Sequence, residues 1–144
     1  MLFTGYIIFW ILIMFMMIGF LVASVFLYLQ GMNLLNACSP ENRKMEPGMI
    51  WLGMIPYFGI GWTFYAIMMI RDTLKLEFEQ KNLQVSNKEF DFSLGLTACI
   101  LMACFYILWW IPILGFLLGI AAVVLTVLYL LKLKQYTDIL NSKS

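Results

Sequence analysis

The charged residues of this 144-residue chain are segregated, and that segregation constrains its fold more strongly than any motif. Residues 1–40, 47–70 and 92–131 carry no Asp, Glu, Lys or Arg. A helix needs about 20 residues to cross the roughly 30 Å core of a bilayer. Because 63% of the residues are apolar, against roughly 45–50% in soluble domains, we expect lipid to be the solvent for most of the chain.

The 40-residue stretch 92–131 is long enough for two spans, and Trp109-Trp110-Ile111-Pro112 supplies a turn near its middle. Proline suits the first turn of a helix, and tryptophan favours the lipid–water interface. One unbroken helix is the alternative, but it would be far too long for the bilayer. We therefore predict a single all-α integral membrane domain over residues 1–144, a polytopic bundle of four transmembrane helices arranged as two hairpins. The predicted spans are about 3–30, 50–71, 90–110 and 112–134.

The distribution of basic residues predicts an orientation. With four spans, loop 71–91 shares a side with both termini, and that side carries seven basic residues against two in loop 31–48. The positive-inside rule then places both termini in the cytoplasm and the Trp109-Trp110 turn outside. The first apolar run lacks a basic start and exceeds the usual signal-peptide core of about 7–15 residues, so we expect an uncleaved span.

Apolar residues continue at helical spacing beyond the second span, which predicts a cytoplasmic helical extension over about 71–83. Glu77 and Lys81 have the spacing of a favourable i,i+4 ion pair, and residues 86–89 fit a capping box. The apolar edge of this extension either docks on a neighbouring helix or receives a partner protein. The residues predicted for partner docking are Leu74, Lys75, Phe78 and Glu79.

Two prolines and four glycines surround the start of the second span, between Pro47 and Gly61. Pro56 removes a helical hydrogen bond, so we predict a kink or a helix start there, as we do at Pro112. Residues 48–55 then form a short interfacial or re-entrant element, or else belong to an ordinary kinked helix. A broken helix in a membrane can mark a binding site.

The run Arg43-Lys44-Met45-x-Pro47-Gly48-x-x-Trp51-Leu52-x-x-Ile55-Pro56 resembles the signature segment of small, uncharacterised families of bacterial multi-span inner-membrane proteins. The short final span and the Lys-rich tail ending in Tyr136 are also similar to these families. The resemblance covers residues 43–136 and implies a bacterial inner-membrane protein. These families have no assigned activity, so the resemblance implies no catalytic residue.

The chain also contains a short sequence pattern that occurs twice. Ile55-Pro56-x-x-Gly59 recurs as Ile111-Pro112-x-x-Gly115. The similarity indicates either a parallel repeat of two hairpins, or a coincidence, or two helices that begin with the same chemistry.

Small residues recur about every four positions along the predicted spans, which suits close helix packing in lipid. We expect these stripes to hold the bundle together, with a face for another subunit as the alternative. The predicted packing residues are Gly115, Gly119 and Ala122 on the fourth span and Gly95 and Ala103 on the third.

Several classes of chemistry are excluded by the residues that are missing. The chain has no histidine, and the charge-free stretches 1–40, 47–70 and 92–131, which hold the cores of the predicted spans, contain no Asp, Glu, Lys or Arg. His-assisted nucleophiles and His-ligated metals are therefore excluded, and a proton relay through the membrane is disfavoured. Cys38, Cys99 and Cys104 lack the spacing of a metal cage. We predict no catalytic residue, metal or cofactor. A net charge of +1 provides no strongly basic surface of the kind that binds nucleic acid.

We therefore expect a non-enzymatic protein that acts through contacts in the bilayer, as a scaffold or accessory subunit of a larger inner-membrane assembly. Its partners would be other membrane-protein subunits or further copies of itself. The alternative is a small homo-oligomeric transporter, or a membrane protein that binds lipid or a small molecule. An enzyme would depend on loop residues such as Glu41, Arg43, Lys44 and Glu46, whose spacing matches no known mechanism.

Overall fold

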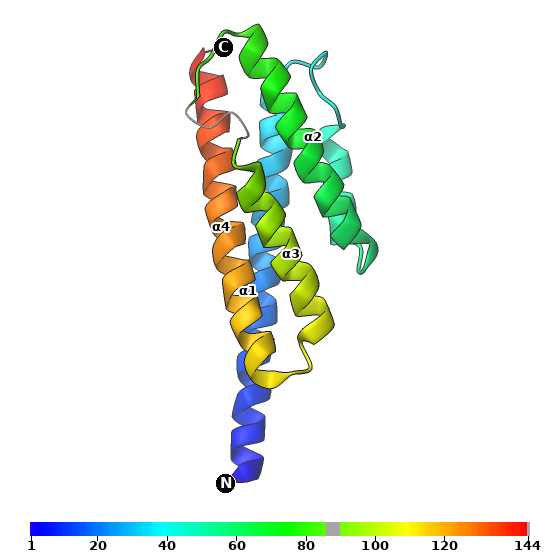
Figure 1. The fold of residues 1–144 in the computed structure, drawn as a ribbon, viewed down its shortest axis with the longest axis vertical. Coiled ribbons are helices and arrows are strands. Elements are labelled where there is room, and N and C mark those ends of the chain that lie inside the picture. The colour runs from blue at the N-terminus through cyan, green and yellow to red at the C-terminus, as the bar shows by residue number, and fades with distance from the viewer. Residues whose placement is uncertain (86–89, 144) are drawn as a thin grey trace.

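The computed structural model describes residues 1–85 and 90–143, and these residues are helical or irregular with no strand. The elements in chain order are α1 (Leu2–Ala37), the 3-10 helix η1 (Pro47–Met54), α2 (Phe58–Gln80), α3 (Phe92–Leu108) and α4 (Pro112–Lys143). Helices α1, α3 and α4 form a long bundle, and η1 and α2 form a hairpin against its upper part (Figure 1). The all-α prediction is confirmed. The predicted capping box at 86–89 lies outside the described residues.

Two helices, rather than four, are long and apolar enough to cross a membrane by length and composition. They are α1 and residues 112–142 of α4, and they favour a membrane location. Helix α3 is apolar but has 17 residues, which extend only about 25 Å. The prediction of four spans in two hairpins is therefore not supported, because the second segment is broken and folds back on itself.

The predicted break at Pro56 is present, and it reverses the chain between η1 and α2. The Phe58 N–H donates to the Pro56 carbonyl over 2.7 Å, which closes a three-residue turn centred on Tyr57. Tyr57 has φ 61° and ψ −55°, the strained γ-turn conformation that an L residue rarely adopts. Residues 48–55 are thus a distinct short element. The hairpin of η1 and α2 begins and finishes toward the same end of the molecule (Figure 1).

The C-terminal ends of α1, α2 and α4 lie together with loop 38–46 at one end of the molecule, the upper end in Figure 1. We call it the charged end, because the charged residues that the structure describes belong to loop 38–46, to α2 and its C-cap from Arg71 onward, to the residue before α3 and to α4 from Lys132 onward. The N-terminus and the α3–α4 turn lie toward the other end. The structure therefore does not support the predicted placement of both termini on one side. Loop 38–46 likewise lies with the C-terminal half of α2, where Lys44 N–H donates to Thr73 Oγ1 over 3.0 Å.

The most deeply buried side chains gather toward the charged end. The fully buried leucines are Leu34, Leu35, Leu74, Leu133 and Leu140. Toward the other end, many large apolar side chains along α1, α3 and α4 are exposed. This distribution has a physical reason, because burial of apolar surface drives packing in water but not in lipid.

Two of the predicted packing glycines, Gly119 and Gly95, lie where helices approach one another, whereas Gly115 lies against the backbone of Leu108 and Trp109 at the α3–α4 turn. A Cβ on Gly119 would come within 2.5 Å of the Met16 sulfur of α1, and one on Gly95 within 2.9 Å of an aromatic ring of α4. Ala122 is fully buried, whereas Ala103 is half-buried. Close approach of α4 to both neighbouring helices therefore depends on small side chains.

The two Ile-Pro-x-x-Gly segments share one backbone hydrogen bond near a helix start, although α2 begins at Phe58, two residues after its proline, and α4 begins at its proline. The Gly59 N–H donates to the Ile55 carbonyl over 2.6 Å, and the Gly115 N–H donates to the Ile111 carbonyl over 2.7 Å. Pro112 is the first residue of α4, a position that suits proline. The shared hydrogen bond favours the interpretation that the sequence similarity reflects how each helix begins.

Candidate functional site

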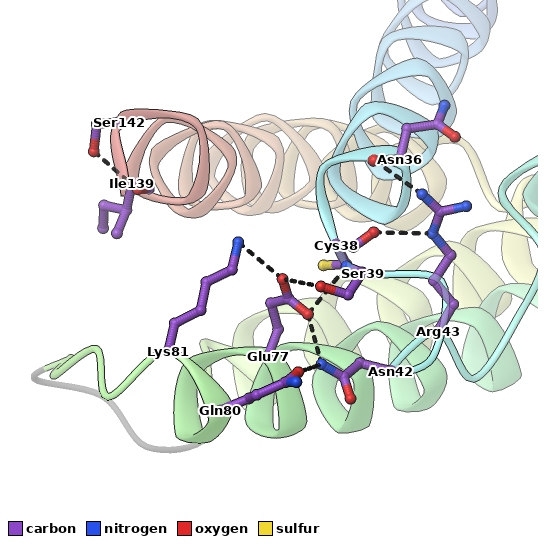
Figure 2. A network of polar contacts seen from close by, with 10 residues as sticks. All are labelled: Asn36, Cys38, Ser39, Asn42, Arg43, Glu77, Gln80, Lys81, Ile139 and Ser142. Atoms are coloured by element: carbon purple, nitrogen blue, oxygen red, sulfur yellow. Dashed lines mark hydrogen bonds and ion pairs between the residues drawn. The ribbon is translucent and has the colours of Figure 1, made fainter. Parts of the chain in front are cut away.

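Glu77 of α2 is a charged side chain with no exposed surface. Its carboxylate accepts hydrogen bonds from the Ser39 N–H (3.0 Å), the Ser39 hydroxyl (3.1 Å) and the Asn42 amide (2.7 Å). Lys81 Nζ lies 3.0 Å from Oε1, which confirms the predicted i,i+4 pair. Figure 2 shows these groups converging on the carboxylate from loop 38–46 and α2. We call Ser39, Asn42, Glu77 and Lys81 the polar clamp.

The surroundings of Glu77 favour its charged form. Burial by itself raises the pKa of the carboxyl group, but the hydrogen bonds from Asn42, Lys81 and Ser39 outweigh it and hold the pKa below its ordinary value. A carboxylate offers about four lone-pair sites, and four donors occupy them here. A carboxylate so committed is suited to holding two segments together rather than to proton transfer.

Arg43 ties the same loop to α1. Its Nε donates to the Cys38 carbonyl over 3.1 Å, and its Nη2 donates to the Asn36 carbonyl over 2.9 Å. These carbonyls lie at the end of α1, where backbone acceptors lack intrahelical partners. Burial raises the pKa of the Cys38 thiol to about 12, so this cysteine stays protonated and unreactive at neutral pH. Hydrogen bonds thus attach loop 38–46 to both α1 and α2.

No cluster of three metal-ligating side chains occurs among the described residues.

The residues predicted for partner docking divide between the core and the surface. Leu74 is fully buried and Phe78 is 2% exposed, with the Phe78 ring edge-on to the Phe90 ring. Lys75 and Glu79 are exposed. The apolar edge is therefore occupied within the chain, because α2 folds back onto the bundle, and it is not available as a docking surface.

A cavity of about 240 Å³ lies at the tip of the η1–α2 hairpin, between α1 and α3. Five of the residues that line it carry hydroxyl groups: Ser24 and Tyr28 of α1, Tyr57, Thr63 of α2 and Tyr106 of α3. The Tyr28 and Thr63 hydroxyls lie 3.2 Å apart, and Ser24 Oγ donates to the Phe20 carbonyl over 2.9 Å. The remaining wall is mostly apolar and includes Cys99. No charged residue lines this cavity.

A second cavity, of about 350 Å³, continues along the same two helices toward the uncharged end. Trp10 and Met17 of α1 line it, together with Phe105 and Trp109. Tyr106 lines both cavities. Helix α4 packs against both α1 and α3, whereas α1 and α3 do not approach each other closely. The two cavities are nevertheless separate, because the Phe20 ring, which lines the first, packs 6.0 Å from the Phe105 ring, which lines the second.

Sequence reasoning missed the polar clamp, apart from the Glu77–Lys81 pair. Ser39 and Asn42 are ordinary loop residues in the sequence, and no spacing rule joins them to a carboxylate on α2 across 38 and 35 positions. The prolines and glycines did indicate the broken hairpin, but not the cavity at its tip. No family model matches the chain, and no curated protein or solved structure is significantly similar to it.

Proposed function

We propose that this protein is a non-enzymatic, multi-pass subunit of a larger assembly in the bacterial inner membrane, acting as a scaffold or accessory component. The observation that carries this proposal is the length of α1. Its 36 residues extend about 54 Å, well beyond the roughly 30 Å core of a bilayer.

The charge-free length of α4 indicates which part of α1 lies within the bilayer. The charge-free part of α4, residues 112–131, extends about 30 Å and fits one bilayer core. Gly119 lies against Met16, and Gln30 donates to Thr137 over 3.1 Å, so α1 and α4 run alongside each other in a defined register. On that register the bilayer covers about residues 9–26 of α1, with the Trp109-Trp110 turn at the uncharged interface.

The N-terminal part of α1 then projects past the membrane core. Trp10 contacts Trp109 at a ring distance of 6.3 Å, which places residues 2–9 beyond the α3–α4 turn. Leu2, Phe3 and Tyr6 in this segment are 94%, 77% and 60% exposed. An apolar segment that projects about 12 Å past the core needs a tilt, a local thickening of the lipid or a protein that covers it. The rest of the bundle matches the bilayer, which favours the third solution.

The topology that follows has α1, α3 and α4 crossing the membrane and the η1–α2 hairpin entering from the charged end. The positive-inside rule places that end in the cytoplasm and the N-terminus outside. From the tip of α2 to Arg71 the helix extends about 18 Å, so the tip reaches the middle of the bilayer while Arg71 stays near the surface. Arg71 pairs there with Asp72 at 3.0 Å.

The partner is proposed to be a different membrane protein. The described residues bring together no catalytic constellation, since the one buried carboxylate is held by four donors. A homo-oligomer would bring together only further copies of the same side chains. An accessory subunit instead takes its activity from the protein that its α1 segment contacts.

Photocrosslinking in intact membranes tests this proposal. A photoreactive amino acid at Phe3 should join the chain to one other polypeptide, whereas the same probe at Leu117, which is 59% exposed on α4, should react with lipid. The double variant Phe3→Ala with Ile7→Ala should abolish the larger complex in native electrophoresis, and Leu117→Ala should retain it. Crosslinks at Phe3 only to lipid, or only to a second copy of this chain, would overturn the proposal.

A further inference from the structure

A third cavity, of about 530 Å³, lies where loop 38–46 meets the hairpin of η1 and α2. Arg43, Lys44 and Glu46 supply its charged groups, and Tyr65 of α2 supplies an aromatic side chain. The other lining residues are Pro40, Met45, Pro47 and Met49. Because two cations face one anion, the lining carries a net positive charge.

Both cations of this cavity retain donors for a further acceptor. The Arg43 guanidinium uses Nε and Nη2 on backbone carbonyls of residues 38 and 36 (Figure 2), and its other N–H groups meet no acceptor among the described residues. Lys44 is exposed, and its ammonium belongs to neither of the ion pairs of the described chain. A negatively charged group with several acceptor oxygens would satisfy both cations, and a phosphate has these properties.

The cavity extends across the level of the lipid headgroups. Lys44 lies beside Thr73, just beyond Arg71, which the proposed topology places near the cytoplasmic surface. Tyr65 precedes Thr73 by eight residues on α2, so it lies about 12 Å deeper. Each headgroup layer of a bilayer is only about 5–8 Å thick. The lining therefore reaches from the cytoplasmic surface to the upper part of the acyl chains.

A row of aromatic rings continues from the cavity along α2 toward the tip of the hairpin. The ring centroid of Trp62 lies 5.0 Å from that of Tyr65 and 5.7 Å from that of Phe58. Trp62 Nε1 donates to the carbonyl of Met49, another lining residue, over 2.8 Å, which fixes the middle ring. Phe58 is 53% exposed and Tyr65 is 38% exposed. Exposed rings that run from a cationic cavity into the apolar layer match a phosphate with a hydrocarbon chain beneath it.

We propose that this cavity binds the phosphate of a phospholipid, with Arg43 and Lys44 as its cationic contacts and an acyl chain along the aromatic row. The ligand is a lipid rather than a free phosphate because the row continues from the cavity into the apolar layer. Glu46 limits the affinity, since its carboxylate repels the phosphate. This site rests on the proposed insertion of the hairpin from the cytoplasmic side, and it is independent of any partner at residues 2–9.

Two photoreactive lipids test the site on the full-length protein in nanodiscs of phosphatidylcholine. One is phosphatidate with a diazirine in one acyl chain, and the other is the diacylglycerol of the same chains, which lacks only the phosphate. Phosphatidate should label residues 47–65 about fivefold more, as expected for one net positive charge near the bilayer surface. Inorganic phosphate should not displace it, because the free ion has no chain to contact the aromatic row.

The contrary outcomes are distinguishable. Equal labelling by the two lipids would show a surface for plain acyl chains and would overturn the phosphate contact alone. Displacement of phosphatidate by inorganic phosphate would assign the cavity to the free ion and would also overturn the proposal. Labelling by neither lipid would show that lipid does not reach the hairpin, which would overturn this site together with the proposed insertion.

Charge variants of the two exposed groups should act in opposite directions. Lys44→Gln should lower the preference for phosphatidate about fivefold, and Glu46→Gln should raise it by a similar factor. Lys132→Gln is the matched control, because Lys132 is an exposed lysine of the charged end that does not line the cavity. Thermal unfolding should be the same in all three variants, since each side chain is exposed. An unchanged preference in Lys44→Gln, an equal effect of Lys132→Gln, or a lowered preference in Glu46→Gln would overturn the assignment.

Discussion

Gly59 lies directly against the backbone of Gly53, so that a Cβ built on Gly59 would overlap the Gly53 carbonyl. This contact joins the first turn of α2 to the last turn of η1 and sets how closely the two halves of the hairpin pack. The obstacle is backbone rather than a flexible side chain, so it cannot move aside without opening the hairpin.

Gly59→Ala should therefore destabilise the protein by about 1–3 kcal/mol, the usual cost of overpacking. Gly61→Ala is the matched control, because a Cβ there meets nothing within 4 Å. That change should be neutral or stabilising by up to about 1 kcal/mol through helix propensity. Unfolding in detergent measures both variants, and equal stability of the two would contradict the hairpin geometry.

Glu77→Gln should destabilise the protein although it preserves the shape of the side chain. It removes the charge paired with Lys81 and turns an amide donor toward groups that are themselves donors. We expect a loss of about 2–4 kcal/mol. Glu79→Gln, at an exposed position of the same helix, should change the stability by less than about 0.5 kcal/mol. A Glu77→Gln variant as stable as Glu79→Gln would rule out a stabilising polar clamp.

The polar clamp also predicts a dependence of stability on pH. The pKa of Glu77 is lower in the folded protein than its unfolded value of about 4.3. The stability that it contributes is therefore complete above about pH 4.3 and is lost as the pH falls through the folded pKa. Thermal unfolding between about pH 3 and 7 should show a smaller acid-induced loss in Glu77→Gln than in the parent chain. Parallel pH profiles of the two proteins would contradict this account.

Cysteine labelling in whole cells, in a background without the native cysteines, tests the topology. Cysteines placed at Glu41 and Ser142 should react only after the membrane is opened, because loop 38–46 and the C-terminus share the charged end. A cysteine at Thr4 should react from outside. Reaction of Glu41→Cys from outside with Ser142→Cys protected would instead restore the four-span arrangement.

Local physical chemistry accounts for the features that could be predicted from the sequence. The helical content follows from long apolar runs, the break between η1 and α2 from Pro56, and the start of α4 from Pro112. The Glu77–Lys81 pair follows from the helical repeat. Each of these features depends on residues within one or two helical turns of one another, so the amino-acid sequence is enough to predict them.

Tertiary structure decided the rest. Charge-free length predicted that residues 50–71 cross the membrane, but length cannot distinguish one continuous span from two halves that fold back. The fold back depends on the Gly53–Gly59 contact and on the capture of loop 38–46 by Glu77, which join residues far apart in the chain. The sequence by itself determined which segments are helical, and the length and composition of α1 and α4 favour a membrane location. Only packing decided that α2 returns to the end from which its hairpin entered, because a buried carboxylate needs donors that loop 38–46 supplies there.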